Sequence, residues 1–114
     1  MREDPAIHRV AVLVLPPVVA FDATIATQVF GRTGFDGDGR PGQGRYETVM
    51  CSLRAGPVAT TTPGFGITVD AGLEAVAGAD TVVVPGFRRG PAPPEALDAL
   101  RAAHERGARI ASVC

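Results

Sequence analysis

The chain ends in the segment ARIASVC, in which a short apolar run typical of a parallel strand leads directly to Cys114. Parallel sheets bind ligands just beyond the carboxyl ends of their strands. A cysteine there is a candidate nucleophile, because its thiolate attacks carbon electrophiles and oxidants. A cysteine among small apolar residues is also a common core residue. The residue pattern leaves both interpretations open.

Two other strand ends carry residues that could complete a site with Cys114. Asp22 follows the apolar run at 8–15, and Gly86 closes the segment DTVVVPG. Since the carboxyl ends of parallel strands share one edge, we expect the three residues to lie around a common crevice. Asp22 is equally explained as the cap of the helix that follows it, and Gly86 as an ordinary turn residue.

The charged residues near these positions favour no single chemistry. Arg88 and Arg89 follow Gly86 and are interpreted first as solvated loop charges. His104 comes late in a helix that runs back along the sheet, so we expect it roughly 20 Å from Cys114, at about 3.3 Å per strand residue. His8 precedes the first strand, so it lies, like His104, at the edge of the sheet opposite to Cys114. Neither histidine is expected to be the base for Cys114.

Hydrophobic patterns predict strands that alternate with helices along the chain. This alternation is typical of an α/β sandwich with a mostly parallel sheet. A proline starts the clearest helix and a glycine follows its end. We expect strands at 8–15, 45–53, 80–86 and 108–114, helices at 21–32, 71–79 and 93–107, and extended pieces around a turn at 56–70.

Composition excludes several classes of protein. The formal net charge of −1 provides no basic surface for nucleic acid and no polybasic face for a membrane. Two cysteines form no disulfide framework and indicate reduced thiols, which favours a cytoplasmic protein. The glycine-rich loop at 34–44 fails the spacing of a calcium loop. We expect no metal and no cofactor.

Four segments, in this order, make the chain resemble the DJ-1/PfpI superfamily. They are VAVLVLPPVVAFDATIATQVFG, GPVATTTPGFGITVD, DTVVVPG and LDALRAAHERGARIASVC, and together they span nearly the whole chain. The resemblance is closest to the amidotransferase-like amino-terminal domain of AraC-type transcription regulators. It implies a flavodoxin-like three-layer sandwich with a mostly parallel sheet.

The resemblance also implies roles for the three strand-end residues. It places Cys114 at a nucleophile elbow, Asp22 at the acidic position that faces the cysteine, and Gly86 at the turn whose backbone N–H lies by the thiolate. Family members commonly have a second glycine after that turn, where this chain has Phe87. This departure weakens an oxyanion-binding role for the turn. The three residues form a candidate site that is either functional or vestigial.

The family continues beyond the elbow, so residues 1–114 are expected to be the amino-terminal part of one domain, truncated after the elbow strand. The expected function is a ligand-sensing or dimerisation domain of an AraC-family regulator, without turnover. The alternative is a cysteine-dependent hydrolase or an isocyanide-hydratase-like lyase, and a third reading is a structural relic with an inert thiol. Expected partners are a second copy, the remaining carboxyl-terminal portion, and DNA only through a domain that is absent here.

Overall fold

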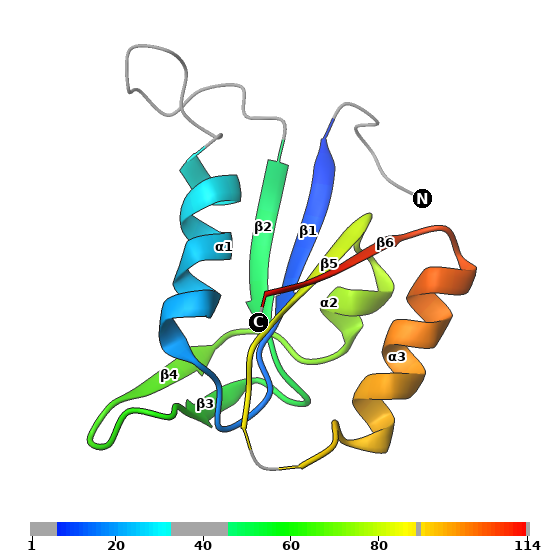
Figure 1. Cartoon of the computed structure of the whole chain (residues 1–114). Helices are drawn as coiled ribbons and strands as arrows, with labels where there is room; N and C mark the ends of the chain where they lie inside the picture. The colour runs from blue at the N-terminus through cyan, green and yellow to red at the C-terminus, as the bar shows by residue number, and fades with distance from the viewer. Residues whose placement is uncertain (1–6, 33–45, 89, 114) are drawn as a thin grey trace.

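The computed structural model describes residues 7–32, 46–88 and 90–113. Nine elements follow one another in these ranges (Figure 1). Each predicted strand and helix is present, and most bounds differ from the prediction by one to three residues. The elements are β1 (His8–Leu13), α1 (Ala20–Arg32), β2 (Tyr46–Cys51), β3 (Gly56–Ala59), β4 (Gly66–Val69), α2 (Glu74–Ala77), β5 (Thr81–Pro85), α3 (Pro94–Glu105) and β6 (Arg109–Val113).

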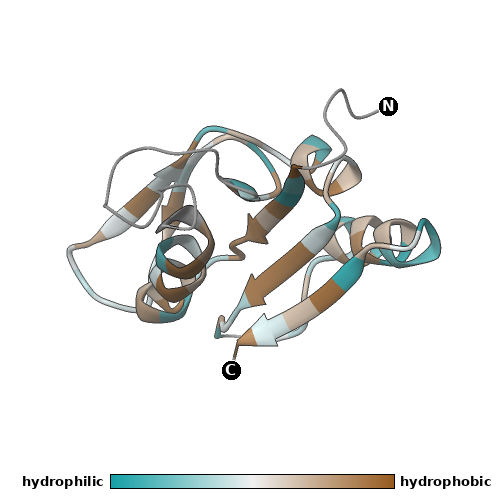
Figure 2. Cartoon of the chain, turned by 90° about the horizontal axis from the view of Figure 1, so that it is seen from above, coloured by the Kyte–Doolittle hydropathy of each residue, from teal (hydrophilic) through white to brown (hydrophobic). Residues whose placement is uncertain are grey.

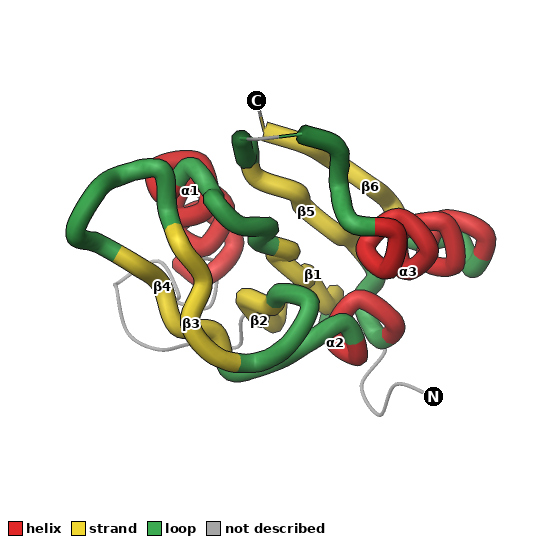
Figure 3. The backbone as a smooth tube through the Cα atoms, turned by 90° about the horizontal axis from the view of Figure 1, so that it is seen from below, coloured by secondary structure: helices red, strands yellow, loops and turns green. Residues whose placement is uncertain are grey.

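Four strands form one sheet in the order β2-β1-β5-β6, and all of its neighbours are parallel. The remaining pair, β3 and β4, forms a separate antiparallel hairpin. Helix α1 and this hairpin lie on one side of the sheet, whereas α2 and α3 lie on the other (Figure 3). The predicted three-layer α/β sandwich with a mostly parallel sheet is therefore confirmed.

Alternation along β1 divides the core into two apolar layers. The side chains of Val10 and Val12 pack with Ala23 and Ala26 of α1, and valines of the hairpin complete this layer. The side chains on the other face pack against α2 and α3. Because both faces of β1 are covered, the strand is apolar and buried from Val10 to Leu13, and Figure 2 shows such hydrophobic stretches in brown within the strands.

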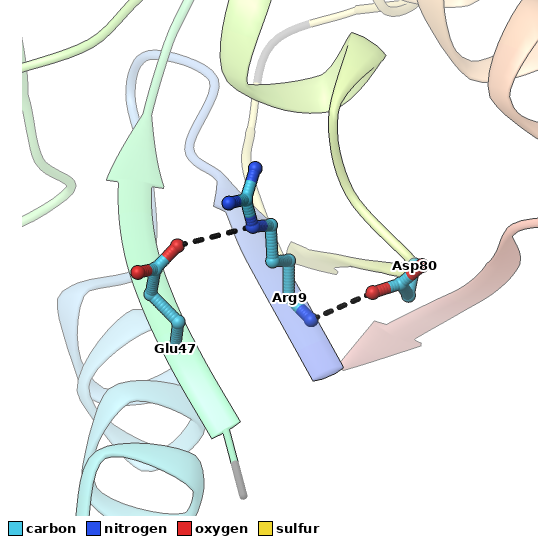
Figure 4. Close-up of polar contacts among 3 residues, drawn as sticks. All are labelled: Arg9, Glu47 and Asp80. Carbon is cyan, nitrogen blue, oxygen red and sulfur yellow. Dashed lines mark hydrogen bonds and ion pairs between the residues drawn. The ribbon is translucent and has the colours of Figure 1, made fainter. Parts of the chain in front are cut away.

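Polar contacts fix the start of β1 between its neighbours. The backbone N–H of Arg9 donates to the carboxylate of Asp80 at 2.8 Å, and the Arg9 Nε lies 3.3 Å from the Glu47 carboxylate (Figure 4). Asp80 immediately precedes β5, and its carbonyl accepts the N–H of Arg109 at 3.0 Å. These contacts set the register at the amino edge of the sheet, which is the edge opposite to the candidate site.

The structure corrects the predicted role of Asp22 as a helix cap. Helix α1 begins at Ala20, because the Val19 carbonyl accepts the first helical hydrogen bond from Ala23 at 3.2 Å. Asp22 therefore lies inside the first turn of the helix and not at its cap.

The buried side of α1 is not the one that its apolar spacing suggested. Ile25 and Val29 suggested the helix by their spacing, yet they are 38% and 56% exposed, and the small residues Ala23 and Ala26 form the buried side. Strand β6 is largely exposed along its length, with Ile110 at 40%. None of the helices among the described residues combines the length and apolar character needed to cross a membrane.

Candidate functional site

The strand order places a topological switch point between β1 and β5. From β1 the chain continues to α1 on one side of the sheet, and from β5 it continues to α3 on the other. Loops that diverge in this way leave a crevice at the carboxyl ends of the two strands, which is where open α/β sheets bind ligands. Asp22 follows β1 and Gly86 follows β5, so both belong to this edge.

The two loops at the switch point are joined by backbone hydrogen bonds. The Val19 N–H donates to the Gly86 carbonyl at 2.8 Å, and the Arg88 N–H donates to the Pro17 carbonyl at 3.1 Å. Between them, Val18 forms an antiparallel bridge with Phe87. The loop that leads to Asp22 therefore lies directly against the Gly86 turn, as the sequence predicted for this pair of strand ends.

The third candidate, Cys114, lies outside the described residues. The residue before it, Val113, is the register partner of Pro85, which precedes Gly86. Asp22 is partly buried, and no described residue forms a hydrogen bond or ion pair with its side chain. The structure thus brings the segments of Asp22 and Gly86 together and leaves the place of the thiol as a proposal.

The β3–β4 hairpin adds a wall that the sequence did not indicate. Its residues hold Val18 from the other side, since the Val18 N–H donates to the Ala59 carbonyl at 3.0 Å and the Val18 carbonyl accepts the Thr61 N–H at 2.9 Å. A cleft of about 620 Å³ lies beside this junction. It is lined by Pro16, Pro17, Ala59, Thr60, Thr61 and Arg88.

The signal for this cleft was weak in the sequence. Pro16 and Pro17 follow the apolar run at 8–15 and give only the signal of a strand end, and their peptide bond is cis. The threonines lie about 40 residues from them along the chain, so only the folded hairpin shows that they are neighbours. Arg88, interpreted first as a solvated charge, lines the cleft, whereas Arg89 lies outside the described residues.

Both histidines lie at the amino edge, as predicted. The His8 Nε2 lies 2.7 Å from the Thr81 hydroxyl at the start of β5, and the His8 ring contacts Tyr46 edge-on. His104 lies in the last turn of α3, where its carbonyl accepts the N–H of Gly107. A cleft of about 750 Å³ at this edge contacts none of Asp22, Gly86 or Arg88. Neither histidine is placed to serve chemistry at the carboxyl edge.

Cys51 is a buried thiol with no exposed surface, at the carboxyl end of β2. Burial, and to a smaller extent the nearby Glu74 carboxylate, raises the pKa of Cys51 from 9.0 to about 12. The Gly72 N–H donates to Glu74 at 3.0 Å and lowers the pKa of that carboxyl. Cys51 is therefore a core thiol. Nowhere in the described ranges do three His, Cys, Asp or Glu side chains gather as metal ligands would.

Comparison with solved structures places this architecture among known folds. An AraC family transcriptional regulator from Pseudomonas putida superposes with a TM-score of 0.68 at 20% sequence identity, covering 92% of this chain and 55% of that one. A ThiJ/PfpI family protein from Pseudomonas syringae superposes with a TM-score of 0.75 at 20% identity, covering 100% of this chain and 46% of that one. The chain has the DJ-1/PfpI fold. The resemblance drawn from the four sequence segments is thus confirmed at the level of the fold.

The comparisons with sequences give no closer relative: no family profile and no curated protein matches the chain. The chain also spans about half the length of the two solved proteins. The shared DJ-1/PfpI fold accounts for the position of the crevice but does not determine the chemistry in it, because one fold supports many functions.

Proposed function

We propose that this chain is the amino-terminal part of a DJ-1/PfpI domain that serves as a ligand-sensing or dimerisation domain of an AraC-type transcription regulator, without turnover. The observation that carries the proposal is the match to the regulator from Pseudomonas putida, which covers 92% of this chain. The net charge of −1 gives the chain no basic face of its own for DNA. DNA contact is therefore assigned to a further domain, and the location to the cytoplasm.

The proposed site consists of Cys114, Asp22 and Gly86 at the switch point. A strand-to-helix turn points a thiol outward, and the amino end of the following helix favours the thiolate. The Asp22 side chain and the Gly86 backbone N–H would face the thiolate from the loops that follow β1 and β5. The contact between the Val19 loop and the Gly86 turn supports this grouping.

The absence of turnover rests on the place of the histidines. His8 and His104 lie at the amino edge, and within the described ranges no histidine lies at the carboxyl edge to act as a base. The full-chain match to the ThiJ/PfpI family protein favours a second candidate, a cysteine-dependent hydrolase or isocyanide-hydratase-like lyase. In that case a base or acid must come from residues beyond those described here.

A homodimer is part of the same proposal. Phe21, Ile25 and Val29 recur every four residues on α1 and are 73%, 38% and 56% exposed, which forms an apolar stripe on the outside of the helix. Exposed apolar patches mark association surfaces. Since the stripe itself carries no charge, a second copy can cover it without opposing like charges.

The experiment is a DNA-binding titration of the intact gene product on the region upstream of its own gene. Saturable binding that weakens on addition of a small-molecule effector supports the regulator. Turnover of amide, ester or isocyanide substrates that Cys114→Ala abolishes, without DNA binding, contradicts it.

Light scattering of the Val29→Glu variant tests the dimer, and a shift to monomer is expected. Ala102→Glu is the control, because Ala102 is exposed on α3, and this variant should remain a dimer.

A further inference from the structure

The cleft beside the switch point contains two side-chain donors that no described residue uses. They are the guanidinium of Arg88 and the hydroxyl of Thr61. The hydroxyl of the neighbouring Thr60 is occupied, because it donates to the Phe65 carbonyl at 2.7 Å. Six residues line the cleft and none of them is acidic, so Arg88 gives it a net positive charge.

The backbone around the cleft offers few additional donors. The N–H groups of Val18, Thr61 and Arg88 donate to the carbonyls of Ala59, Val18 and Pro17. Phosphate sites usually depend on several free backbone N–H groups that converge on the anion. One guanidinium and one hydroxyl match instead the two oxygens of a carboxylate, which a guanidinium binds through paired hydrogen bonds.

The rest of the cleft is lined by Thr60 and three apolar residues, and it is held in place. The apolar residues among them are Pro16, Pro17 and Ala59. The backbone of Arg88 is fixed by the hydrogen bond from its N–H to the Pro17 carbonyl. The adjacent residue, Phe87, is held by its bridge to Val18. A volume of about 620 Å³ is within the range of sites that hold a small organic molecule.

We propose that this cleft binds a small organic monocarboxylate, with Arg88 paired to the carboxylate, Thr61 donating to one of its oxygens, and the apolar part of the ligand against Pro16 and Pro17. This inference rests on the proposed function, since it names the ligand class of the sensing site. The cleft adjoins the Gly86 turn through Arg88, so a bound carboxylate changes the contacts of the loop that leads to Asp22.

The test is isothermal titration of the full-length protein with benzoate, and with benzamide as the neutral analogue of similar shape. Benzoate is expected to bind at least about tenfold more tightly than benzamide, because a hydrogen bond to a charged group is worth that much. Arg88→Gln is expected to weaken benzoate binding about tenfold, and Thr61→Val, which keeps the shape, about fivefold. Arg101→Gln is the matched control, since Arg101 is 73% exposed on α3 and pairs only weakly with Asp98.

Benzoate binding that Arg88→Gln leaves unchanged, or no binding of benzoate, overturns the inference. Tighter binding of inorganic phosphate than of benzoate overturns the assignment to carboxylates. DNA titrations on the same preparations separate this inference from the proposed function. Carboxylate binding through Arg88 without DNA binding supports the carboxylate site and contradicts the regulator function. DNA binding without carboxylate binding supports the regulator function and contradicts the carboxylate site.

Discussion

The backbone N–H of Val19 donates a 2.8 Å hydrogen bond to the carbonyl of Gly86, which joins the loop after β1 to the turn after β5. The two residues are 67 positions apart in the sequence. Their contact spans the switch point of the sheet, where the chain leaves neighbouring strands for opposite faces. It is the link that brings the Asp22 segment to the Gly86 turn.

Val18 is the residue on which this junction depends, and its side chain is fully buried. We expect Val18→Ala to reduce the free energy of unfolding by about 2 kcal/mol, because it removes two buried methyl groups and leaves a cavity between the hairpin and the turn. Urea unfolding followed by circular dichroism measures this change. Ala102→Ser, at an exposed position on α3, is the control and should alter stability by less than about 0.5 kcal/mol. A wild-type unfolding midpoint in Val18→Ala would show that the junction contributes nothing to stability.

The sequence predicted the elements because their signals are local. The run of Val and Leu before Pro16 marks β1, and the glycine at 107, with its φ of 101°, follows the end of α3 as predicted. It did not predict that α1 packs through Ala23 and Ala26, because the larger Ile25 and Val29 dominate the helical pattern while the close approach of helix and sheet admits small side chains.

The candidate site and the cleft depend on contacts between residues that are far apart in the sequence. The approach of Asp22 and Gly86 could be expected from the rule that parallel strands end at one edge. The cleft could not, because its threonines belong to a hairpin that reaches the edge only after β3 and β4 pair. The cap role of Asp22 was wrong because the bond from Ala23 to Val19 starts the helix earlier.

The buried thiol predicts a stability loss at alkaline pH. The folded-state pKa of Cys51 is raised to about 12 from 9.0, so the folded protein holds the thiol proton more tightly than the unfolded chain does. The resulting stability is fully present below pH 9.0 and is lost as the pH rises from 9.0 toward 12. Between pH 8 and pH 10 we expect the wild type to lose about 1 kcal/mol more than Cys51→Ala. The absence of lysine leaves few other groups that titrate in this window. Parallel pH profiles of wild type and variant in urea unfolding would contradict the role of Cys51.

The same burial predicts a difference in reactivity between the two cysteines. At neutral pH a thiol with a pKa near 12 is roughly a thousandfold less ionised than one near 9, and the side chain of Cys51 is fully buried. Iodoacetamide should therefore modify Cys114 well before Cys51 in the full-length folded protein, and Cys51 only after unfolding in guanidinium. Timed labelling followed by peptide mass spectrometry measures both rates. Equal rates, or faster labelling of Cys51, would mean that Cys114 is a core thiol.

The dependence of that labelling on Asp22 tests the proposed site itself. If the Asp22 carboxyl donates a hydrogen bond to the Cys114 thiolate, Asp22→Ala should slow alkylation about fivefold, the effect of losing roughly 1 kcal/mol of hydrogen bonding. Asp22→Asn retains an N–H donor and should react closer to the wild-type rate. His8→Ala and His104→Ala should leave the rate within about twofold, because both side chains belong to the amino edge. Circular dichroism of each variant verifies that the fold is intact. Asp22 belongs to the switch point because it lies in the first turn of α1, three residues after Val19, whose N–H donates to the Gly86 carbonyl. A labelling rate that Asp22→Ala leaves unchanged but His104→Ala lowers would therefore place the group that activates Cys114 away from the switch point.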